Sequence, residues 1–114
     1  MIESTVISYL ESKLSVPVVG EVPEKNTGKF VVVEKVGSSR TNYLDTATIA
    51  IQSYADTLVE AAALNRLAKS FMLDATDVES ITAVRLNSDY NFTDTETKRY
   101  RYQALFVITY YDEE

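Results

Sequence analysis

The sequence predicts an α+β fold in which two helices pack on one face of an antiparallel or mixed β-sheet. Two observations lead to this fold class. Apolar residues recur at helical spacing in two segments, and four other segments are β-branched or alternate like half-buried strands. These segments follow one another in the order helix, strand, strand, helix, strand, strand. The 114 residues have the size of one domain, so residues 1–114 are expected to fold as a single α+β domain.

The first third of the chain is predicted to hold a helix, an edge segment and a strand. The helix covers residues 3–14 and ends before Pro17, because the residue before a proline disfavours the helical backbone region. Residues 16–23, "VPVVGEVP", indicate an extended edge segment or a loop. The valine-rich run "KFVVVEKV", residues 29–36, predicts a strand, and the polar run "GSSRTNYLD", residues 37–45, predicts a loop.

A second strand and a second helix are predicted to follow that loop. Residues 46–52 have the alternation of a half-buried strand. Asp56 can act as the N-cap of the helix, or Thr57 and Glu60 can form a capping box if the helix starts one residue later. The apolar residues of this helix form one stripe at helical spacing. That stripe consists of Leu58, Ala61, Leu64, Leu67, Ala68, Phe71 and Met72.

The last third of the chain predicts a hairpin. Residues 74–80 form a turn, residues 81–92 form a strand, and residues 93–98, "TDTETK", form a polar tip. One face of the return strand, residues 99–111, carries Tyr100, Tyr102, Ala104, Phe106, Ile108 and Tyr110. The chain has eight tyrosines, a residue type favoured both in sheets and at interfaces. The tyrosines of this strand therefore either cover the sheet within the monomer or form an assembly surface.

Composition excludes several classes of chemistry. The chain has no cysteine and no histidine, which excludes disulfides, zinc sites, thiol nucleophiles, Ser-His triads and imidazole acid/base catalysis. Asp74, Asp77 and Glu79 are too few ligands for a calcium loop, and the three glycines of the chain provide no phosphate-binding loop. We therefore predict no catalytic residue, no cofactor and no metal. An enzyme built on this chain would depend on carboxylates, lysine or tyrosine.

Charge and hydropathy limit the partners. A formal net charge of −6 gives the domain no general attraction for the phosphates of nucleic acids. The longest wholly apolar run, "ALFVI", is too short to span a bilayer, and the N-terminus lacks the basic start of a signal peptide. We expect no specific nucleic-acid binding, no membrane partner, and a cytoplasmic location when the chain is made.

The ordered set of segments resembles one protein family over essentially the whole chain. A short N-terminal helix precedes a strand ending in "IAIQSYADT", which turns directly into the alanine-rich helix "EAAALNRLAKSF". A tip, "NFTDTET", and the return strand "RYRYQALFVITYY" follow. This set resembles the tail terminator, or tail completion, proteins of long-tailed bacteriophages and prophages. The resemblance implies a structural protein that caps the tail tube as a ring, expected to be hexameric, and provides the head-docking surface.

The resemblance also implies partners and a location. The partners are further copies of the chain, the tail tube protein and a head-side connector or stopper protein, with DNA passing through the ring. The protein is expected in the host cytoplasm during assembly and then at the head–tail junction of the virion. Exposure and chemistry select the residues expected to contact neighbouring subunits or the tube. These residues are Arg40 and Tyr43 in one loop, and Asp94, Lys98 and Arg99 at the other tip.

Two other functions stay open. The chain is alternatively a head-completion or connector subunit on the capsid side of the joint, which binds portal complexes instead of tail tubes. It is also compatible with a small cytoplasmic adaptor that binds a peptide by β-augmentation. Such an adaptor would be a stable monomer with one peptide partner and no affinity for tubes.

Overall fold

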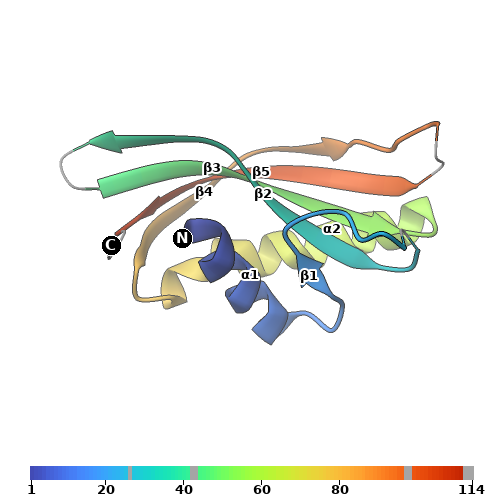
Figure 1. The fold of residues 1–114 in the computed structure, drawn as a ribbon, viewed down its shortest axis with the longest axis horizontal. Coiled ribbons are helices and arrows are strands. Elements are labelled where there is room, and N and C mark those ends of the chain that lie inside the picture. The colour runs from blue at the N-terminus through green and yellow to red at the C-terminus, as the bar shows by residue number, and fades with distance from the viewer. Residues whose placement is uncertain (26, 42–43, 97–98, 112–114) are drawn as a thin grey trace.

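A computed structural model describes residues 1–25, 27–41, 44–96 and 99–111 of the chain. The protein is elongated, with extents of 43 × 24 × 24 Å, and it consists of a five-stranded sheet with helices on one face (Figure 1). The elements are α1 (Ile2–Lys13), β1 (Val18–Val19), β2 (Phe30–Thr41), β3 (Leu44–Ala55), α2 (Leu58–Leu73), the 3₁₀ turn η1 (Ala75–Asp77), β4 (Ile81–Asn91) and β5 (Tyr100–Tyr110). The predicted α+β class is confirmed.

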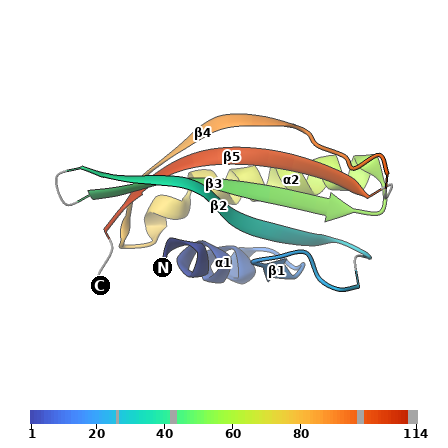
Figure 2. The same cartoon turned by 45° about the horizontal axis from the view of Figure 1, so that its top comes forward.

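The sheet has the strand order β1-β2-β3-β5-β4. The pairs β2–β3, β3–β5 and β5–β4 are antiparallel, whereas β1 runs parallel to β2 and pairs with it through Val18 and Val19. The sheet is therefore mixed, and the proline-flanked segment is a two-residue edge strand. Both helices lie on the same side of the sheet: Figure 1 shows them below the strands, and in Figure 2 α2 is seen behind β3 and β5.

The hydrophobic core lies between the sheet and the two helices. It is formed by alternate residues of the strands, as expected from the period of two, and by one side of each helix. Its largest fully buried side chains on this face are Val6, Leu10, Val31, Val33, Ile49, Ile51, Met72, Phe106 and Ile108. Tyr110 is buried and Tyr100 and Tyr102 are half-buried, so these tyrosines are largely used within the monomer.

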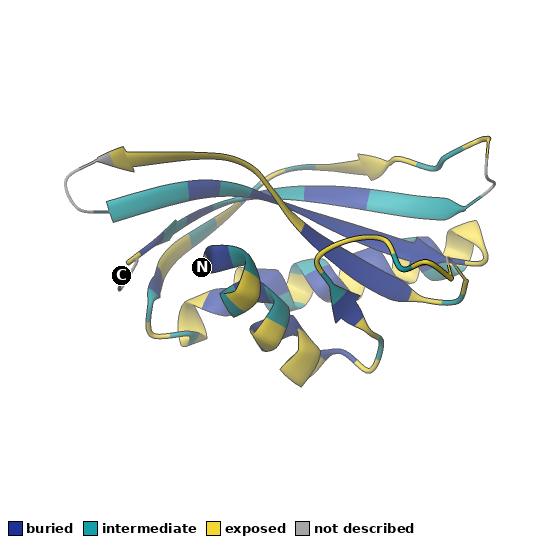
Figure 3. Cartoon of the chain, viewed as in Figure 1, coloured by how far each residue is buried: buried dark blue, intermediate teal, exposed yellow. Residues whose placement is uncertain are grey.

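The loop predicted for residues 37–45 is wrong. β2 continues to Thr41 and β3 begins at Leu44, with Gly37 opposite Thr48 and Arg40 opposite Asp45. Residues 36–41 and 44–48, called the arm below, extend the hairpin, and the side chains of residues 36–40 are exposed (Figure 3). The sequence signal failed because strand prediction depends on a buried face, whereas backbone pairing needs no apolar side chain.

The apolar stripe predicted for α2 is partly wrong. The buried residues of α2 are Ala61, Leu64, Asn65, Ala68 and Met72, whereas Leu58 and Leu67 are 40% and 48% exposed. The same side of the helix also makes polar contacts with β4. Asn65 Nδ2 donates to Asp89 Oδ1 at 3.4 Å, and Lys69 Nζ lies 2.8 Å from Asp89 Oδ2. Asn65 is therefore buried although it lies outside the predicted apolar stripe.

The sequence allows Asp56 or Thr57 as the N-cap of α2, and the structure has Thr57. Thr57 is the N-cap, and its hydroxyl accepts a hydrogen bond from the Glu60 backbone N–H at 3.2 Å and donates to Glu60 Oε1 at 3.0 Å. These contacts satisfy one of the N–H groups that a helix leaves free in its first turn. In the described part of the chain, neither helix is long and apolar enough to cross a membrane.

Candidate functional site

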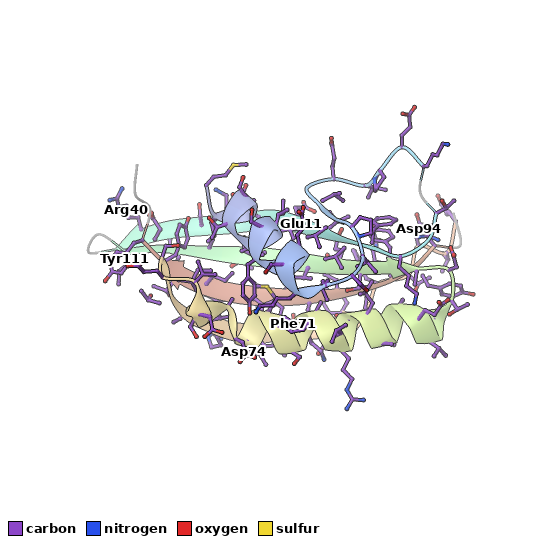
Figure 4. All side chains as sticks on the ribbon, turned by 90° about the horizontal axis from the view of Figure 1, so that it is seen from below. Glu11, Arg40, Phe71, Asp74, Asp94 and Tyr111 are labelled. Carbon is purple, nitrogen blue, oxygen red and sulfur yellow. The ribbon has the colours of Figure 1, made fainter. Side chains whose placement is uncertain are left out.

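The residues expected to contact neighbouring molecules lie at opposite ends of the protein. Arg40 is near the end of the arm, and Asp94 lies at the far end, beside the β4–β5 tip (Figure 4). Arg99 forms an isolated β-bridge with Asp94 and is therefore at the same end. Tyr43 and Lys98 lie outside the described residues. The structure thus gives two separate candidate surfaces instead of one.

Arg40 is the most accessible of the three described residues. Its side chain is 65% exposed, and Nε lies 3.8 Å from Oδ1 of Asp45 on the opposing strand. An exposed ion pair at this distance holds the guanidinium weakly. Arg40 can therefore turn toward another molecule at low cost, and its interface role stays a prediction.

Asp94 and Arg99 are engaged in contacts within the chain. Asp94 Oδ1 accepts from the Glu96 backbone N–H at 3.0 Å, which shapes the turn of the tip. The Arg99 side chain is only 11% exposed, with Nη1 2.6 Å from Asp56 Oδ1 and Nη2 2.6 Å from the carbonyl oxygen of Gly28. Gly28 has a φ of +76°, which a glycine adopts without strain. Arg99 therefore joins the segment before β2, the start of α2 and the start of β5.

Arginine and aromatic side chains form a second cluster on the helix-free face of the sheet. The rings of Phe30 and Tyr54 are stacked with centroids 4.6 Å apart. The Arg101 guanidinium lies 4.3 Å from the Phe92 ring centroid, and its Nη1 donates to the Tyr54 hydroxyl at 2.9 Å. Its Nε donates to the Phe92 carbonyl oxygen at 2.8 Å. These contacts fix the β4–β5 tip against the sheet.

A pair of buried glutamines continues this cluster. Gln52 Nε2 donates to Gln103 Oε1 at 2.7 Å, and Gln103 Nε2 donates to the Tyr90 hydroxyl at 2.6 Å. The pair lies on opposed positions of β3 and β5, so the Gln103 amide oxygen accepts directly from the Gln52 side chain. Sequence reasoning missed this network. Its only signal was the polar start of the outer face of the return strand.

A shallow groove of about 560 Å³ runs beside α1 and is lined by Ser4, Thr5, Ser8, Tyr9, Ser12 and Val78. The Tyr9 hydroxyl donates to the carbonyl oxygen of Phe71 at 2.8 Å, which ties α1 to the C-terminal end of α2. Burial, and to a lesser extent the charges of Asp74 and Asp77, raise the pKa of Tyr9 above its usual value. The lining of the groove carries mainly hydroxyl groups.

The acidic residues after α2 form a turn, as the sequence predicts. Ala75–Asp77 is a 3₁₀ turn, and its last backbone groups pair with Asp74 and Ala75. Among the described residues, no group of three or more carboxylates is placed to hold a metal ion.

Both edges of the sheet are long and uncovered in the described part of the chain. β1 pairs with β2 only at Val31 and Val32, so residues 34–41 of β2 have a strand on one side only. β4 has 11 residues and ends the sheet at the other side. Edge strands present unpaired N–H and C=O groups on which another strand can add. The edges and the arm are therefore the parts of this fold best suited to contact another chain.

Comparison with known proteins adds no family assignment. No protein-family model matches the sequence, and a search of curated proteins gives no significant match.

Proposed function

We propose that this protein is a tail terminator subunit of a long-tailed phage or prophage. Copies form a ring, hexameric in the resembling family, on the head-proximal end of the tail tube. The ring stops tube growth and provides the surface to which the filled head binds. The observation that carries the proposal is a sheet with helices on one face only, two uncovered edges and a projecting arm.

A ring requires two different surfaces on each subunit, because every copy contacts one neighbour with each of them. The edges of β2 and β4 lie on opposite sides of the sheet, so they are suitable as such a pair. The helices leave the other face of the sheet uncovered, which provides a wall for a lumen or a further contact surface. This arrangement supports self-assembly over a role that needs one concave binding pocket.

A terminator also needs separate contacts with the tube and with the head. The arm end near Arg40 and the tip near Asp94 lie at opposite ends of the long axis, so each is available to a different partner. The net charge of −6 supports passage of DNA without retention, because the chain offers no general attraction for phosphates. Under this proposal the protein acts in the host cytoplasm and then at the head–tail junction.

The uncovered 11-residue edge of β4 also favours a second function, a small adaptor that adds a peptide strand to this edge. The two functions differ in the number of copies involved. An adaptor stays monomeric and binds one peptide, whereas a terminator contacts further copies of itself and a tail tube. A head-side connector would bind portal complexes in place of tubes.

The first experiment is electron microscopy of particles from the source phage after deletion of this gene. Filled heads separate from tails of irregular or excessive length would support the terminator. Tails of normal length beside unjoined heads would instead favour the capsid-side connector. Intact infectious particles would overturn an assembly role and leave the adaptor as the leading function.

Complementation of the deletion then tests the arm. An Arg40→Glu chain is expected to restore fewer joined particles than the wild-type chain, because Arg40 is exposed at the end of the arm. Arg66→Glu is the matched control, since Arg66 is exposed on α2 and makes the same charge change far from the arm. Equal complementation by both variants would argue against an arm contact through Arg40.

A further inference from the structure

The helix-free face of the two inner strands carries no charged residue along eight positions. These positions alternate with core residues of β3 and β5 and pair with one another across the two strands. They are Thr46, Thr48, Ala50 and Gln52 on β3, and Gln103, Leu105, Val107 and Thr109 on β5. Charged residues make up 25% of the chain, yet these positions include none, and Leu105 and Val107 are half-buried apolar side chains. Because the water-facing side of an antiparallel sheet is usually polar, this face is suited to pack against another protein surface.

The outer strands add one charge each to the same face, and the two charges have opposite sign. Glu34 of β2 is exposed and lies opposite Ala50. Arg85 of β4 is exposed, and its neighbours Val84 and Leu86 pack against the core, so Arg85 is on the helix-free side. Neither Glu34 nor Arg85 forms an ion pair with any described residue. Both charges are therefore available to another molecule.

The strand order decides how a second copy of the sheet can cover this face. Two sheets that pack face to face lie about 10 Å apart, with their strands aligned within about 30°. A two-fold axis parallel to the strands, between β3 and β5, places β2 of each copy over β4 of the other and β3 over β5. A two-fold axis across the strands would place β2 over β2 and β4 over β4, where the helix-free face carries charges of one sign only. Only the first arrangement brings opposite charges together.

The same axis fixes which residues face each other, because each row of paired residues lies over the same row of the other copy. The row of Glu34 continues through Ala50 and Leu105 to Ser88. The second copy presents this row in reverse order, so Glu34 faces Ser88 and Leu105 faces Ala50. Ala50 is short and fully buried between its longer neighbours. Each facing pair therefore combines a long side chain with a short one, which is how two packed layers interdigitate.

A second row supplies the partner of Glu34. It runs from Gly37 through Thr48 and Val107 to Arg85, so Arg85 of each copy faces Gly37 of the other. A Cβ atom at Gly37 would meet no other atom within 4 Å, so the space above this residue is open. The row lies two residues from that of Glu34, or about 7 Å along the strands. Arg85 placed over Gly37 is therefore beside Glu34 of the same copy, and the two-fold axis makes this contact twice.

We propose that two copies of this chain pack face to face through the helix-free faces of their sheets, with β2 of each copy over β4 of the other. Glu34 of each copy forms an ion pair with Arg85 of the other, on both sides of a centre formed by Leu105 and Val107. This dimer goes beyond the tail-terminator function. It uses the face of the sheet and leaves the backbone groups of both edges free for other contacts.

Mixing two charge variants of the purified chain tests the dimer. Glu34→Arg and Arg85→Glu each place like charges together twice, so each alone is expected to dimerise about tenfold more weakly in a concentration series followed by native mass spectrometry. A heterodimer of the two variants has two pairs of opposite charge and is expected to form nearly as well as the wild-type dimer. Glu11→Arg and Arg66→Glu are the matched controls, because both residues are exposed on helices. A wild-type chain that stays monomeric, or a mixture without rescue, would overturn the proposal.

A substitution at Gly37 tests the facing residues independently of that exchange. Gly37→Arg fills the open space and places a second positive charge against Arg85 of the other copy, so it is expected to weaken the dimer at least about tenfold. Its urea denaturation should match that of the wild-type chain, since the added side chain meets nothing within the monomer. Ser38→Arg is the matched control, because Ser38 is exposed but lies opposite Ala47, on the other face. Equal dimerisation of both variants would overturn the proposed arrangement.

These results are separable from the tail-terminator function. Rescue of dimers on mixing the charge variants, together with intact particles after gene deletion, would support the dimer and overturn the terminator. Filled heads separate from overlong tails after deletion, with a purified chain that is monomeric at every concentration, would support the terminator and overturn the dimer.

Discussion

Arg99 connects three segments that are far apart in the sequence. Its guanidinium contacts Asp56, the Gly28 carbonyl oxygen and the face of the Phe30 ring, which lies 5.7 Å away. Asp56 is 63% exposed, so solvent screens part of that ion pair. The bond to the Gly28 carbonyl and the packing on Phe30 therefore provide much of the stabilisation.

Arg99→Ala is expected to lower the free energy of unfolding by about 2 kcal/mol, because it removes two charge-assisted hydrogen bonds of a mostly buried side chain. Urea denaturation followed by circular dichroism measures the change. Arg66→Ala is the control, since Arg66 is exposed on α2 and should change stability by less than about 0.5 kcal/mol. Equal effects of the two substitutions would mean that Arg99 is no more than a surface charge.

Tyr9 gives the protein a pH-dependent contact between its helices. Tyr9→Phe removes the hydrogen bond to Phe71 and is expected to cost about 1 kcal/mol at neutral pH. The folded-state pKa of Tyr9 is raised, so its contribution is complete below the unfolded pKa of about 10 and is lost as pH rises through the folded pKa. The difference between wild type and Tyr9→Phe should therefore stay constant up to about pH 10 and shrink above that pH in urea titrations. A difference that is constant or grows above about pH 10 would contradict this assignment.

At the scale of the element, α2 buries a face that differs in part from its apolar stripe. Asn65 and Lys69 both bind Asp89 of β4, and the helix turns its alanines toward the sheet. Leu67 is left at the surface although it fits the apolar period. Leu64, which is buried, and Leu67, which is half-exposed, should therefore contribute differently to the free energy of unfolding.

Leu64→Ala and Leu67→Ala separate these roles. Leu64 is 7% exposed, so its truncation leaves a cavity and is expected to cost about 2–3 kcal/mol of unfolding free energy. Leu67→Ala removes a half-exposed side chain and should cost less than about 1 kcal/mol. Thermal or urea unfolding of the two variants gives the comparison directly. A larger loss for Leu67→Ala would mean that α2 is rotated differently in solution.

At the scale of the whole molecule, stability is expected to be uneven across the sheet. β3 and β5 each have a strand on both sides, whereas the arm and β4 have one uncovered edge. Amide hydrogen exchange should therefore be slowest in the middle of β3 and β5 and fastest in residues 36–41 and on the outer edge of β4. Uniform protection of β4 and β5 in dilute protein would contradict an uncovered edge. Slower exchange of β4 at high protein concentration would agree with edge pairing.

The candidate site was only partly accessible from sequence. The sequence does not distinguish a free charged residue in a polar tip from a paired one. Arg40 and Arg99 were therefore both predicted to be exposed. Arg40 is exposed, but the partners of Arg99 come from residues 28 and 56, which no local pattern connects to it. Asp94 is likewise used in its own turn. The edges of the sheet were also invisible, because strand order is a property of the whole fold.

The sequence by itself excluded the chemistry of histidine and cysteine side chains. It also determined the α+β class and the alternating faces of the main strands. These follow from composition and from periods of two and 3.6 residues, which are local properties of the chain. Only the tertiary structure decided the position of β5 between β3 and β4, the paired arm and the residues of α2 that are buried. Each of these depends on contacts between residues distant in sequence, and such contacts leave no periodic signal in the chain.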